Sequence, residues 1–239
     1  MCWSSTADLV AGGTVAGLGV AALTQVRRVR QLPLAALPLL LGVHQLIEAL
    51  VWWGEEGRIG AGTAGAARVA WAVIAYPLLP ALVPLGVLLV APPARRALPA
   101  VFLTVGLASS AVLAYAVASG PVTAAVDGHT LRYGVGVPHG TLVGAGYLLA
   151  TVGALLASGQ RDIRTLGLVC GAGAAVCLTL WQTAFVSTWC ALAALSSVFV
   201  LRWLVRARGW PSGPADGADR GAASPVRSVL PGGDGPSAV

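Results

Sequence analysis

The stretch LPLAALPLLLGVHQLIEALVWW, residues 32–53, decides the class of fold. A helix needs about 20 predominantly apolar residues to cross a lipid bilayer, and this stretch supplies them. Its second half nevertheless carries His44, Gln45 and Glu48. Polar and ionisable groups inside a membrane span cost free energy, so we interpret them first as candidates for a functional site.

The composition of the whole chain indicates an integral membrane protein. Of the 239 residues, 56% are hydrophobic and 10% are charged, and the mean hydropathy is +0.80. Soluble domains carry about 25% charged residues, so this chain has too few to cover a soluble surface. All 15 basic residues are arginine, which excludes chemistry that needs a lysine amine, such as a retinal or pyridoxal Schiff base. The net charge of +6 does not indicate nucleic-acid binding, because the arginines gather at the ends of apolar blocks.

Apolar blocks of about 20 residues recur along the chain and predict an all-α bundle of seven transmembrane helices. The predicted spans are 7–26, 32–53, 69–91, 98–119, 141–157, 165–181 and 188–205. Arginines follow the first, third, fifth and seventh blocks, so the positive-inside rule places the N-terminus outside and the C-terminus in the cytoplasm. Residues 1–208 therefore form the predicted membrane domain. Residues 209–239, rich in Gly, Pro, Ser, Ala and Asp, form a predicted disordered cytoplasmic tail.

Three local patterns predict details of these helices. Ser5 and Asp8 have the spacing of a capping box at the start of the first span. Gly13 and Gly17 form a GxxxG pattern, and this small-residue face suits close packing against another helix. Gly12, Ala16 and Gly19 lie nearby. The three prolines of span 69–91 predict a broken or kinked helix whose freed carbonyls need partners inside the bundle.

The predicted topology gathers polar residues on the outer side of the membrane. His44 and Glu48 are four residues apart and share one helix face with Trp52, and they lie about 12 Å and about 6 Å below it. The connection 120–140, GPVTAAVDGHTLRYGVGVPHG, is long and rich in turn residues, and such loops are often functional. The candidate ligand-binding residues are His44, Gln45, Glu48, Trp52, Arg132, Tyr133, His139 and Gln182.

Several functions are compatible with this pattern. The leading interpretation is an outward-facing polar pocket that binds a small ligand or ion for transport or sensing. A metal or haem site built on His44, Glu48 and His139 is an alternative, because imidazole and carboxylate are metal ligands. A seven-helix zinc hydrolase would require His129 to join the other two histidines. In a structural or accessory subunit, the same polar residues would only hold helices together.

Two pairs of residues have competing interpretations. Cys2 and Cys190 fall on the predicted outer side, where they are either a disulfide or two unrelated small side chains. Arg132 either lines the rim of the pocket or pairs with Asp127 or a lipid headgroup.

Four segments of this chain form a recognisable set of motifs. They are Met1-Cys2-Trp3-Ser4 with Ala7-Asp8, Leu37 to Trp52, Gly128 to Gly140, and Trp189-Cys190. Together they resemble the motifs of an uncharacterised family of bacterial multi-pass membrane proteins, in which phenylalanine stands at the position of Trp3. The resemblance implies a multi-pass domain in the bacterial plasma membrane and supplies no activity.

Overall fold

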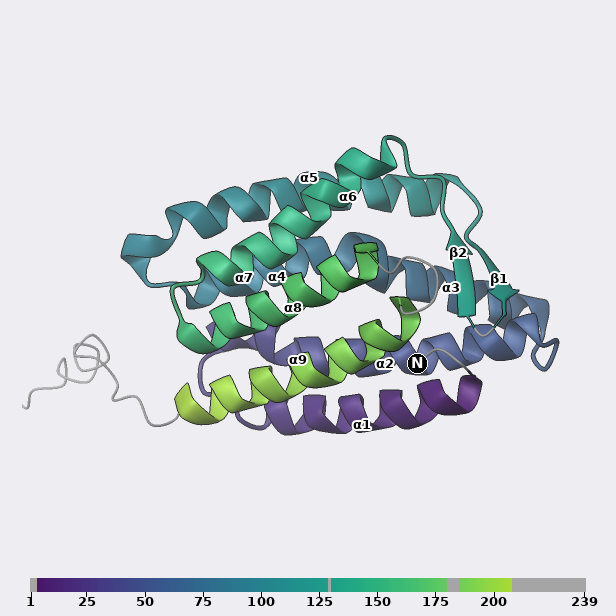
Figure 1. Cartoon of the computed structure of the whole chain (residues 1–239), viewed down its shortest axis with the longest axis horizontal. Coiled ribbons are helices and arrows are strands. Elements are labelled where there is room, and N and C mark those ends of the chain that lie inside the picture. The colour runs from purple at the N-terminus through teal and green to yellow at the C-terminus, as the bar shows by residue number, and fades with distance from the viewer. Residues whose placement is uncertain (1–3, 129, 180–184, 208–239) are drawn as a thin grey trace, which may run out of the picture. The chain divides into compact units, whose positions relative to one another are not determined.

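The computed structural model describes residues 4–128, 130–179 and 185–207, with the backbone alone for 177–179 and 185–191. Helices dominate this part of the chain, and they pack along one another (Figure 1). The longer helices are α1 (Ser5–Leu23), α2 (Leu32–Glu55), α3 (Ala61–Val73), α4 (Leu79–Val90), α5 (Ala97–Ser119), α6 (Gly140–Leu148), α8 (Arg161–Thr179) and α9 (Phe185–Ala207). The shorter helical segments are α7 (Ala154–Ala157), the 3-10 turns η1 (Val29–Gln31) and η3 (Pro93–Arg95), and the π-turns η2 (Ile74–Leu78) and η4 (Leu149–Gly153).

The predicted all-α class is confirmed, with one small sheet added. Among the described residues, five helical segments are long and apolar enough to cross a membrane. They are Ser5–Thr24, Val29–Glu55, Ala61–Val90, Ala97–Ser119 and Gly140–Ala157. The last two predicted spans fall on α8 and α9, so the count of seven and the orientation of the bundle stay predictions. The predicted tail, 209–239, lies outside the described residues.

Helices α1 and α2 pack closely through small residues. A Cβ atom at Gly12 would lie 3.0 Å from the carbonyl oxygen of Gly42, and one at Gly19 or Gly42 would collide with the backbone of the facing helix. Of the predicted small-residue face of α1, Gly12, Ala16 and Gly19 make the close contact with α2. Gly13 and Gly17, which form the GxxxG pattern itself, do not, since a Cβ atom at either position meets open space. The contact face lies one residue, about 100° around the helix, from the Gly13 and Gly17 face.

The proline-rich third span remains helical from Ala61 to Val90 by adopting a π-turn, η2, around Pro77. In a π-turn, the N–H of one residue donates to the carbonyl five residues earlier. Pro80 stands five residues after Ala75 and has no N–H group, so the carbonyl of Ala75 lacks this donor. The hydroxyl of Tyr147 in α6 donates a hydrogen bond of 3.0 Å to the carbonyl of Ala75. The hydroxyl of Ser110 in α5 donates to the carbonyl of Pro77. The carbonyl of Ala75, whose donor within the helix Pro80 removes, thus has a partner inside the bundle, as expected.

Removing one of these hydroxyls tests the role of the π-turn in stability. The Tyr147→Phe substitution is expected to lower the free energy of unfolding by about 1 kcal/mol, the usual size of an interhelical hydrogen bond in membrane proteins. Unfolding by titration with a denaturing detergent measures the change. Tyr115→Phe in α5 is the matched control, since that ring is 69% exposed and its loss of a hydroxyl should have no effect.

The connection between α5 and α6 contains a β-hairpin that the sequence did not predict. Strands β1 (Thr123–Asp127) and β2 (Thr130–Gly134) pair antiparallel, and Gly128 takes a left-handed conformation (φ 60°) in the turn. Ala124 and Leu131 are buried on the face that meets the Trp52 end of α2. The hairpin therefore covers the end of α2 that carries the polar residues (Figure 1).

Candidate functional site

The polar residues of α2 point into the bundle. His44, Gln45 and Glu48 are 6%, 3% and 6% exposed, and Trp52 on the same face is 5% exposed. Val43, which directly precedes His44 in sequence, is 38% exposed, as the helical period allows. The fold therefore buries the part of the candidate site that lies on one helix.

His44 lies beside a cluster of aromatic rings from three elements. Its ring lies 4.9 Å from the ring of Trp71 in α3, centroid to centroid. Trp71 stacks in parallel on Tyr133 of β2, with a centroid distance of 3.5 Å and an interplanar angle of 5°. Tyr76 of η2 meets the same indole edge-on at 6.1 Å. Trp71 thus connects the helix that carries His44 to the hairpin.

Several buried polar atoms of this region have no hydrogen-bond partner among the described residues. They are Nε2 of His44, Oε1 of Gln45, and the indole Nε1 atoms of Trp52 and Trp71. An unpaired polar group costs free energy when it is buried, so such atoms normally bind water or a ligand. We call the set His44, Gln45, Trp52 and Trp71 the α2–α3 polar site.

Asp8 is a further polar residue near this site that sequence reasoning assigned to another role. The N-cap of α1 is Ser4, whose hydroxyl accepts a hydrogen bond from the N–H of Ala7, so the predicted capping box of Ser5 and Asp8 is wrong. The carboxylate of Asp8 is fully buried. Because α1 and α2 run antiparallel, Asp8 lies one turn beyond Gly12, toward the end of α2 that carries Glu48.

The remaining candidate residues lie apart from these buried groups or outside the described residues. Arg132 is exposed and pairs with Asp127 on the hairpin, as one of the two interpretations predicted. His139 is exposed at the start of α6, in a left-handed conformation with φ 49°. Gln182, His129 and the disulfide candidates Cys2 and Cys190 lie outside the residues whose side chains are described.

The predicted metal ligands occupy different environments. His44 and Glu48 are buried in α2, whereas His139 is exposed. Within the described part of the chain, no group of three or more His, Cys, Asp or Glu side chains could hold a metal ion. The geometry therefore supplies hydrogen-bonding groups and aromatic faces at the α2–α3 polar site.

Fold and site together define a helical protein with helices apolar enough to cross a membrane. Three ionisable residues, Asp8, His44 and Glu48, are buried between its helices. Residues 1–214 match the family described as "Family of unknown function (DUF6629)", and the chain belongs to this family. The resemblance to an uncharacterised family is thereby confirmed. No curated protein and no solved structure matches the chain.

Proposed function

We propose that this protein binds a small polar ligand or ion at the α2–α3 polar site, for transport or sensing across a bacterial plasma membrane. The observation that supports the proposal is the set of buried, unpartnered atoms at His44, Gln45 and Trp71. Between membrane helices there is little bulk water to satisfy such groups. A bound molecule that exchanges hydrogen bonds with them would remove the cost of their burial.

The chemistry of the site defines the kind of ligand. The imidazole of His44 can donate or accept, the amide oxygen of Gln45 accepts, and the indole of Trp71 donates. Asp8 and Glu48 are buried at the same end of the bundle and add negative charge when they are ionised. A small molecule with both donors and acceptors, neutral or positively charged, suits this environment best.

The distribution of arginines supports a site that faces outward through seven spans. Three clusters follow α1, α4 and α7, and a fourth lies in the last two turns of α9. The end of α2 with Trp52 lies opposite the first cluster. The clusters are Arg27, Arg28 and Arg30, then Arg95 and Arg96, then Arg161 and Arg164, then Arg202 and Arg206.

The test is a ligand screen of the full chain in lipid nanodiscs, with thermal unfolding as the readout. A compound that binds the folded state alone adds about 2.7 kcal/mol of stability at about 100 times its Kd. Such a compound should stabilise the wild type and the Val43→Ala control, and have no effect on His44→Ala. Stabilisation that persists in His44→Ala would place the binding elsewhere and contradict the proposal.

The same samples distinguish the metal or haem alternative. Elemental analysis and an absorption spectrum of the purified protein report a bound metal or a Soret band. A stoichiometric metal or haem that is present in the wild type and lost in His44→Ala would replace the proposed polar ligand with that group.

A further inference from the structure

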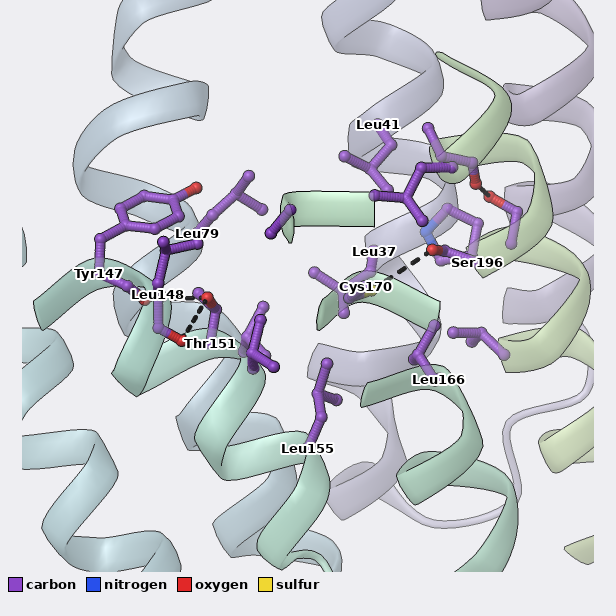
Figure 2. Close-up of a pocket in the computed structure, with 18 residues that line it drawn as sticks. Leu37, Leu41, Leu79, Tyr147, Leu148, Thr151, Leu155, Leu166, Cys170 and Ser196 are labelled. Carbon is purple, nitrogen blue, oxygen red and sulfur yellow. Dashed lines mark hydrogen bonds between the residues drawn. The ribbon is translucent and has the colours of Figure 1, made fainter. Parts of the chain in front are cut away.

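A second candidate site lies away from the α2–α3 polar site, nearer the Leu32 end of α2. It is a half-enclosed cavity of about 120 Å³ between α2, α4, the helical run from α6 to α7, α8 and α9. Figure 2 shows Tyr147, Leu148 and Leu79 facing Leu37, Leu41 and Cys170 across the hollow. The lining is almost entirely apolar, and no residue of the α2–α3 polar site belongs to it.

The polar groups in the wall of this cavity are engaged with one another or with the backbone. The hydroxyl of Tyr147 donates to η2, and those of Thr151 and Ser197 each donate to the carbonyl one turn earlier in their own helix. The thiol of Cys170 lies 3.6 Å from the hydroxyl of Ser196, within hydrogen-bond distance for sulfur. With these groups engaged, the cavity favours an apolar occupant over water or a polar ligand.

Small side chains and an irregular helix create the space. Ala174 of α8 and Ala193 and Ser196 of α9 line the cavity where larger residues would fill it. The π-turn η4 contributes Thr151 and Val152 from the opposite side. Protein interiors contain few voids larger than a water molecule, and an apolar cavity of about 150 Å³ in another protein binds benzene. A cavity of this size and lining can therefore hold an apolar molecule or part of one.

We propose that this cavity binds a segment of hydrocarbon chain from a membrane lipid. Its walls include helices that are long and apolar enough to cross a bilayer. Acyl chains are the apolar molecules present at the highest concentration beside such helices, and the cavity is only half enclosed. The occupant and the residues differ from those of the proposed polar ligand, so the two proposals stand or fall separately.

Photo-crosslinking tests this site in the full chain. The protein is reconstituted into phosphatidylglycerol vesicles that contain a lipid with a diazirine in the middle of its acyl chain, and labelled residues are mapped by mass spectrometry. Labels are expected on cavity residues such as Cys170, Ala174 and Ser196. Labelling confined to exposed residues of α9 such as Leu195 and Val198 would overturn the proposal.

A matched pair of substitutions on α8 tests the cavity itself. Ala174→Phe fills the space, whereas Ala172→Phe places the same ring on an exposed position two residues away. Displacing about two buried methylene groups should reduce cavity labelling about tenfold in Ala174→Phe and leave it unchanged in Ala172→Phe. An equal effect of both substitutions would overturn the proposal. A cavity that no lipid labels, together with a free apolar compound found by native mass spectrometry and lost in Ala174→Phe, would also overturn it.

Discussion

Replacing Gly42 with leucine is expected to lower the free energy of unfolding by about 3 kcal/mol, because it forces α1 away from α2. A Cβ atom at Gly42 would collide with the backbone nitrogen and Cα of Ala16, and backbone atoms move only if the whole helix shifts. Denaturing-detergent titration of the protein in bicelles, followed by circular dichroism, measures the loss.

Gly17→Leu is the control for this experiment. Gly17 lies on α1, one residue from Ala16, yet it is exposed and its Cβ position meets open space. The substitution adds the same apolar volume where lipid can accept it, so stability should stay unchanged or rise slightly. Equal destabilisation by Gly17→Leu and Gly42→Leu would mean that the close contact between α1 and α2 does not set the stability.

The sequence predicts which segments are helical far better than it predicts which helix faces meet. Apolar blocks define α1, α2 and α5, because crossing a bilayer requires length and hydrophobicity that a linear pattern displays. Small residues, however, occur on more than one face of α1. Gly13 and Gly17 form the GxxxG pattern, whereas the contact residues are Gly12, Ala16 and Gly19. Both sets are small, and only the register of α1 against α2 selects between them.

The sequence predicted those residues of the candidate site whose positions follow from the spacing along one helix. It did not predict the residues that packing between helices brings there. The spacing of His44 and Glu48 places both on the buried face of α2. Trp71 gave no such signal, since an aromatic near the end of an apolar span is usually an interfacial residue. The local capping pattern concealed Asp8, whose burial depends on the packing of α1 against the rest of the bundle.

The β-hairpin was unpredictable for a related reason. Its strands, TAAVD and TLRYG, are only five residues each and include Ala, Asp and Gly, which strands disfavour. An isolated two-stranded hairpin is marginally stable at best in water. Here the buried side chains of Ala124 and Leu131 and the stacked ring of Tyr133 hold it against α2 and α3. Its stability therefore depends on contacts that no short stretch of sequence contains.

Replacing Trp71 with alanine is accordingly expected to release the hairpin from the helices. The substitution removes the ring that stacks on Tyr133 and also contacts His44, and loss of a partly buried tryptophan should cost about 3 kcal/mol. Hydrogen exchange of the backbone amides over 123–134 should become faster, while exchange in α5 stays slow. Mass spectrometry of the protein in nanodiscs measures both regions in one experiment.

Trp53→Ala separates this effect from a general loss of aromatic packing. Trp53 lies at the same end of α2, but its ring faces the guanidinium of Arg58 at 5.0 Å. Exchange in the hairpin should therefore remain slow in Trp53→Ala. Slow exchange in Trp71→Ala as well would show that Ala124 and Leu131 hold the hairpin by themselves. Fast exchange confined to Trp71→Ala would establish that the indole beside His44 also holds the hairpin over the α2–α3 polar site. Opening of the hairpin and exposure of the site would then be one event.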